Sequence, residues 1–119
     1  MLAHPDDDPH HPILPDSYSW EVLEFTYRRD PDDWRETYID LLFARDGIER
    51  RLRFFAPREV EIPRVAGGVM GSWCRVYVAD VRGRQLEGIG VMVASFEPDW
   101  CVPSFYAATV IEVAEPTHA

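Results

Sequence analysis

Residues 34–55 read WRETYIDLLFARDGIERRLRFF, and the fold class depends on them because their first half fits both a helix and a strand. Read as a helix over residues 31–45, it would begin after an N-cap aspartate and end just before Gly47. Read as a strand, it places a row of apolar side chains on one face, namely Ile39, Leu41 and Phe43. Asp46-Gly47 between two apolar runs is the strongest short-range signal for a β-hairpin. We therefore predict the hairpin, with the helix as the alternative.

Outside this hairpin, further segments have the aromatic and β-branched composition that is typical of strands. They are residues 18–28, 59–62, 73–81, 86–96 and 104–113. Short turns separate them, and no helical pattern alternates with them. Together with the hairpin they give about seven strands, mostly antiparallel, so we predict an all-β sandwich or partial barrel. A helix near residues 31–45 would make the domain α+β instead.

The chain of 119 residues has the size of one domain, and its composition divides it into a body and two ends. Residues 1–17 hold four prolines, four aspartates and three histidines, a mixture that favours a disordered or loosely docked tail. Ile13 and Leu14 are the side chains through which this tail could dock. We expect a single β domain over residues 18–114 and a short tail over residues 115–119.

The formal net charge is −9, from 21 acidic and 12 basic residues. A chain this acidic repels phosphate backbones and anionic lipid, so we expect neither nucleic-acid nor membrane binding. A basic protein is the partner that this charge would attract. All 12 basic residues are arginine, which excludes Schiff-base chemistry and phosphate binding by a lysine.

Few residues suited to catalysis occur in the body of the chain. Its histidines lie in residues 1–17 and at position 118, so a nucleophile–histidine pair cannot be built on the predicted strands. The histidines and aspartates of residues 1–17 have no fixed spacing that would hold a metal ion. We therefore assign no catalytic residue, no metal site and no cofactor, and expect a protein that is not an enzyme. The alternative is an enzyme that uses carboxylates on the predicted strands for acid–base chemistry. These carboxylates are Glu24, Asp40, Asp80 and Glu87.

Cys74 and Cys101 are isolated, without a C-x-x-C motif or a neighbouring histidine. This spacing does not indicate zinc, although a disulfide would form if their strands were neighbours. No signal peptide and no long apolar run is evident, so we expect a cytoplasmic protein with reduced thiols.

Two groups of residues are candidates for a ligand or partner surface. The first is a basic run on the second hairpin strand, where Arg51 and Arg53 point to the same face. Its charges suit either a partner or cross-strand ion pairs with the nearby glutamates. The second group consists of aromatic residues and one arginine, which are enriched at binding hot spots. Its members are Trp73, Arg75, Tyr77 and Trp100.

A pattern spread over the middle and end of the chain resembles small uncharacterised bacterial β-rich proteins, some of them similar to immunity proteins encoded beside toxins. The residues that carry it are Leu52-Arg53-Phe54, Pro57, Asp80-Val81, Gln85-Leu86-Glu87-Gly88, Val91, Val93, Phe96-Glu97 and Phe105. The resemblance implies a non-catalytic bacterial protein whose acidic surface meets a basic toxin.

Together these observations predict a non-enzymatic interaction module, with a homodimer through an edge strand as one arrangement it could adopt. The alternative is a small-ligand-binding β domain with a cavity lined by aromatic side chains.

Overall fold

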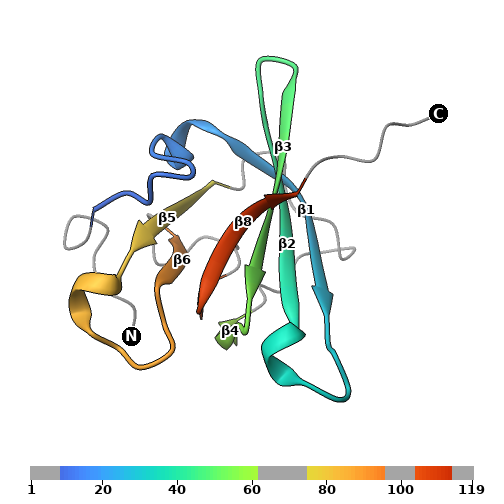
Figure 1. Ribbon diagram of the computed structural model, residues 1–119. Coiled ribbons are helices and arrows are strands. Elements are labelled where there is room, and N and C mark those ends of the chain that lie inside the picture. The colour runs from blue at the N-terminus through green and yellow to red at the C-terminus, as the bar shows by residue number, and fades with distance from the viewer. Residues whose placement is uncertain (1–8, 62–74, 96–103, 114–119) are drawn as a thin grey trace.

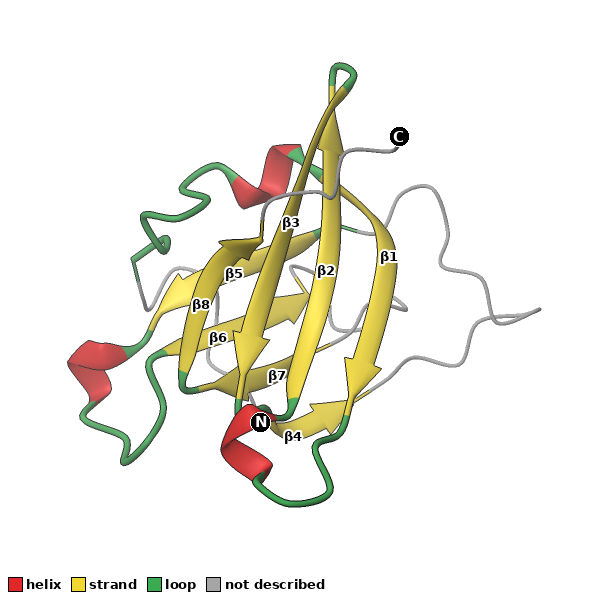
Figure 2. Ribbon diagram, turned by 45° about the vertical axis from the view of Figure 1, so that its right-hand side comes forward, coloured by secondary structure: helices red, strands yellow, loops and turns green. Residues whose placement is uncertain are grey.

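The computed structural model describes residues 9–61, 75–95 and 104–113, which form two antiparallel sheets of four strands each (Figures 1 and 2). The first sheet has the order β1 (Glu21–Arg28), β2 (Tyr38–Arg45), β3 (Ile48–Phe55) and β8 (Thr109–Val113). The second has the order β4 (Arg58–Glu61), β7 (Ser104–Ala107), β6 (Val91–Ser95) and β5 (Val76–Asp80). Three 3₁₀ turns complete the described elements, namely η2 (Ser17–Ser19), η3 (Trp34–Glu36) and η5 (Arg82–Arg84). The predicted all-β sandwich is therefore confirmed.

The hairpin of β2 and β3 is present, and the alternative helix is absent from these residues. Arg45 pairs with Ile48, which leaves a two-residue loop of Asp46 and Gly47. Both loop residues have a positive φ, at 51° and 79°, as a type I′ turn requires. Of the alternative helix, only the single 3₁₀ turn η3 is present. The residues after it form β2, a central strand whose side chains are buried on both faces of the sheet.

The last predicted strand is in fact two strands that belong to different sheets. β7 pairs with β4 and β6 in the second sheet, whereas β8 pairs with β3 in the first. Ala108 lies between them and donates its backbone N–H to the carbonyl of Phe55 at 2.8 Å. This division explains why eight strands are observed where the sequence indicated about seven.

The strands of the two sheets cross steeply, and the main hydrophobic core fills the space between them (Figure 2). Phe54 and Phe105 meet at its centre from opposite sheets, with ring centroids 5.2 Å apart in an edge-to-face arrangement. The remaining buried side chains of this core are Leu14, Trp20, Val22, Ile39, Leu41, Phe43, Leu52, Val76, Val78, Val91, Val93 and Ala107.

A second apolar cluster covers the other face of the second sheet. Its buried members are Tyr77, Ala79, Val81, Met92, Ala94 and Tyr106. The second sheet is therefore apolar on both faces. Val76 and Val78 of β5 face the main core, and Tyr77 faces the second cluster.

Residues 9–17 are attached to the second sheet more firmly than a loose tail would be (Figure 1). They run along β5, where His11 donates its N–H to the carbonyl of Val78 at 2.9 Å. The Ser17 hydroxyl accepts a hydrogen bond from the Val78 N–H at 3.0 Å. Leu14 is fully buried in the main core and Ile13 packs against it, so the predicted docking through these two side chains is confirmed. The segment also covers the free edge of β5.

Two strands depart from a regular alternation over their predicted range. In β1 the register shifts between Val22 and Glu24, so Phe25 packs on the core side together with Val22, although strict alternation would place these two residues on opposite faces. The predicted strand over residues 86–96 begins only at Val91, and Ile89, which precedes it, packs against the second cluster. No helix in the described parts of the chain is long and apolar enough to span a membrane.

Candidate functional site

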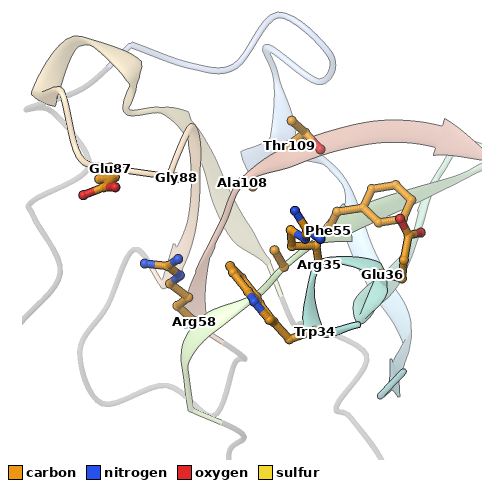
Figure 3. Close-up of a pocket in the computed structure, with 10 residues that line it drawn as sticks. Trp34, Arg35, Glu36, Phe55, Arg58, Glu87, Gly88, Ala108 and Thr109 are labelled. Carbon is orange, nitrogen blue, oxygen red and sulfur yellow. The ribbon is translucent and has the colours of Figure 1, made fainter. Parts of the chain in front are cut away.

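An open pocket of about 780 Å³ lies at the corner where the chain passes from one sheet to the other (Figure 3). The chain crosses between the two sheets twice at this corner. One crossing is at Ala56, between β3 and β4, and the other is at Ala108, between β7 and β8. The residues that line the pocket are Trp34, Arg35, Glu36, Phe55, Ala56, Arg58, Glu87, Gly88, Ala108 and Thr109. Its position is therefore a direct consequence of the two strand crossings.

The backbone at this corner adopts conformations that L-residues rarely take. Ala56 and Glu59 both have a φ of 53°, and they flank Arg58. Between Arg58 and Glu61 the pairing of β4 with β7 is irregular. The N–H of Ala56 is held by the carbonyl of Thr37 at 2.9 Å, which fixes the first of these residues. Strained backbone of this kind is concentrated at functional sites, where surrounding contacts keep it in place.

Trp34 is presented to the pocket by a turn that is tied together by aspartates. The Asp30 carboxylate accepts hydrogen bonds from the N–H groups of Asp32 and Asp33, and the Asp33 carboxylate caps η3 through the Arg35 N–H. The Asp30 N–H in turn donates to the Thr37 hydroxyl at 3.0 Å. Held in this way, the Trp34 side chain remains 53% exposed, which is unusual for the largest apolar residue.

Arg58 stacks on this tryptophan, with its guanidinium carbon 5.0 Å from the centre of the Trp34 ring. Figure 3 shows the Arg58 side chain beside the indole and directed toward Gly88. A Cβ atom at Gly88 would lie 3.4 Å from the Arg58 guanidinium, so the absence of a side chain there leaves room beside the charge. Gly88 also has a φ of +69°, a conformation that favours glycine.

The charge of Arg58 is not neutralised by a carboxylate of the described residues, in contrast to many other arginines of the chain. The arginines that pair with an Asp or Glu of the described ranges are Arg35, Arg45, Arg50, Arg51, Arg53 and Arg82. Arg35, the second cation of the pocket, is bound to Asp33 at 3.1 Å. Its hydrogen bond lowers the pKa of the Asp33 carboxyl below the usual range. Of the two arginines that line the pocket, Arg58 is therefore the one without a carboxylate partner in the part of the chain that the structure describes, and Glu36 and Glu87 also line the pocket.

Arg51 and Arg53, which the sequence placed on one face, do share the outer face of β3, but outside the pocket. Arg53 binds Asp40 through two hydrogen bonds, at 2.9 and 3.0 Å, and stacks over the Tyr38 ring at 3.9 Å. The hydrogen bonds that Arg53 donates to the Asp40 carboxylate raise the pKa of Arg53 above its ordinary value. Arg51 lies 3.7 Å from the Glu24 carboxylate. Both arginines therefore form ion pairs across strands, as one interpretation of the sequence had it, but the partners are Asp40 and Glu24 instead of the glutamates near the basic run.

Of the second candidate group, the two members in the described part of the chain, Arg75 and Tyr77, are not among the residues that line the pocket. Tyr77 is only 3% exposed and belongs to the second apolar cluster, where its ring lies 4.5 Å from that of His10. Arg75 is exposed just before β5, at the edge of the second sheet farthest from β4. Trp73 and Trp100 lie outside the described residues.

None of Trp34, Phe55 and Arg58 was among the candidate surface residues that the sequence analysis named. One signal in the sequence could have indicated Trp34. It directly follows the turn sequence Asp30-Pro31-Asp32-Asp33, and turns lie on the surface, where a tryptophan side chain is often left exposed. The pairing with Arg58 could not be read, because it depends on the crossing from β3 to β4.

In the ranges that the structure describes, no three histidine, cysteine, aspartate or glutamate side chains are grouped as a metal ion would require. Comparisons of the chain with protein-family models, curated proteins and solved structures find no match.

Proposed function

We propose that the protein is a non-enzymatic interaction module that binds a polypeptide partner at the corner pocket. The observation that carries this proposal is the exposed pair of Trp34 and Arg58, stacked at 5.0 Å in a preformed hollow. Tryptophan and arginine are the residues most enriched among binding hot spots. Because the pair is already ordered, little side-chain entropy is lost on binding.

The partner that fits best is basic overall. The net charge of −9 produces a field that accelerates the approach of a positively charged protein over distances of about one Debye length, roughly 8–10 Å. Carboxylates at the pocket rim, Glu36 and Glu87, and the neighbouring Glu59 on β4 bring this charge close to the site. A basic toxin met by an immunity-like protein in the bacterial cytoplasm is a partner of this kind, as the sequence resemblance suggests.

A second candidate function is the binding of a small ligand. The volume of about 780 Å³ lies within the range of ligand pockets, and Trp34 and Phe55 supply aromatic surface. The pocket is open instead of enclosed, so a polypeptide segment is the better occupant.

The experiment is affinity capture from a lysate of the encoding organism with three immobilised proteins: the wild type, Trp34→Ala and Ile48→Ala. Ile48 is a matched control, because it is an exposed apolar residue, 58% accessible, beside the turn of the β2–β3 hairpin. We expect one basic polypeptide to be retained by the wild type and the control but lost by Trp34→Ala. It should also elute at roughly 0.5 M salt, where charges are strongly screened.

Equal retention by Trp34→Ala would show that the pocket is not the binding site. If no polypeptide is retained, the interaction module is contradicted. Native mass spectrometry of the purified chain would then test the second candidate through a retained small molecule.

A further inference from the structure

We infer that the corner pocket recognises the free C-terminal carboxylate of its partner, with Arg58 as the residue that binds it. The inference rests on the proposed function and adds the chemical group that the site selects. A partner that is basic overall still carries one terminal carboxylate, so long-range attraction and this local contact act together.

The geometry of Arg58 presents its hydrogen-bond donors to the pocket. The Arg58 guanidinium carbon lies 5.0 Å from the centre of the Trp34 ring, and Arg58 is an exposed residue, so a ligand in the pocket can reach its N–H groups. A planar guanidinium donates two parallel N–H bonds to a carboxylate, a match that neither a hydroxyl nor an amide offers. The position is set by the backbone, since the left-handed residues Ala56 and Glu59 lie two before and one after Arg58.

The apolar lining favours a terminal residue over an acidic side chain. A C-terminal residue carries its carboxylate and its side chain on the same Cα atom, so both groups enter a pocket together. Phe55, Ala56 and Ala108 provide apolar contacts for such a side chain. A glutamate side chain ends at its carboxylate and brings no apolar group beyond it. The site therefore fits a terminal residue with an aromatic or large aliphatic side chain.

The rim charges restrict the ligand to a single negative charge. Glu36 and Glu87 line the pocket together with Arg58, and Arg35 is already bound to Asp33. A phosphate or a run of acidic residues would bring more negative charge toward these carboxylates, which like-charge repulsion disfavours. One carboxylate balances one available guanidinium.

The test is an NMR titration of the full ¹⁵N-labelled chain with three short peptides. The probes are acetyl-Gly-Gly-Phe with a free carboxylate, the same peptide as its C-terminal amide, and acetyl-Gly-Glu-Phe-amide. The Trp34 indole N–H, assigned through Trp34→Phe, reports on the pocket. Arg58→Gln removes the guanidinium, and Arg75→Gln removes an equal charge from an exposed position outside the pocket.

We expect the free acid to shift the Trp34 signal and to bind about tenfold or more tightly than its amide, as a charge-assisted hydrogen bond implies. Arg58→Gln should abolish this preference, and Arg75→Gln should retain it. Equal binding of acid and amide would overturn the carboxylate inference while leaving the pocket as a binding site. Preference for the glutamate peptide, or no shift with any probe, would also overturn it, whereas the proposed function is decided separately by the capture experiment.

Discussion

Replacing Leu14 by alanine tests whether the N-terminal segment is part of the folded core. Composition alone favours a tail in this region, in which case the substitution would have almost no effect. In the structure Leu14 is fully buried among the side chains between the two sheets. A buried Leu→Ala change removes apolar contacts and leaves a cavity, at a cost of about 2–5 kcal/mol.

The size of the effect can be converted into a melting temperature. With roughly 2.1 cal/mol/K of unfolding entropy per residue, a chain of 119 residues has about 250 cal/mol/K. A loss of about 3 kcal/mol then lowers Tm by about 12 °C. Leu23→Ala is the matched control, because Leu23 lies at the irregularity of β1 and is 43% exposed. We expect about 0.5 kcal/mol or less for this control.

Urea unfolding followed by tryptophan fluorescence, together with thermal unfolding by circular dichroism, measures both variants against the wild type. All three proteins should show the same dependence of the unfolding free energy on urea concentration, which would indicate that each exposes the same surface on unfolding. A loss below about 0.5 kcal/mol for Leu14→Ala, equal to that of the control, would refute the placement of this residue in the core.

Three further changes test other parts of the fold. Gly90→Ala should lower the free energy of unfolding by about 1–3 kcal/mol, because the new Cβ atom would lie 2.7 Å from the backbone oxygen of Ala108. Gly83→Ala is the control: its Cβ atom would meet nothing within 4 Å, so urea unfolding should show no change or a slight gain in stability. Burial lowers the pKa of His11 below 6.5, so the unfolded chain binds more protons than the folded one as pH falls through 6.5. Stability should therefore decrease from pH 7.5 to pH 5, and unfolding of His11→Gln at both pH values should show a smaller decrease; an unchanged slope would contradict this. Asp40→Asn weakens a buried ion pair with Arg53 and should cost about 1–3 kcal/mol, whereas an unaltered urea midpoint would show that the pair contributes nothing.

Local sequence patterns were sufficient to predict the fold class and the hairpin at the centre of the first sheet. Asp46-Gly47 specified the hairpin because the two-residue turn needs positive φ at both positions, a requirement that is local to the dipeptide. Alternation then placed Ile39, Leu41 and Phe43 on one buried face. These features depend on neighbours a few residues apart, which a sequence pattern records directly.

The points at which the chain changes sheets, and therefore the position of the pocket, depend on tertiary packing and could not be predicted. Neither crossing can be recognised from composition. At Ala56 the φ is 53°, a conformation in which alanine is not expected. At Ala108 the sequence over residues 104–113 has the pattern of one continuous strand, although the structure divides it into β7 and β8. Trp34 and Arg58 are 24 positions apart in sequence and meet only because both crossings occur at the same corner. A contact of this kind is set by the packing of one sheet on the other, which no local pattern encodes.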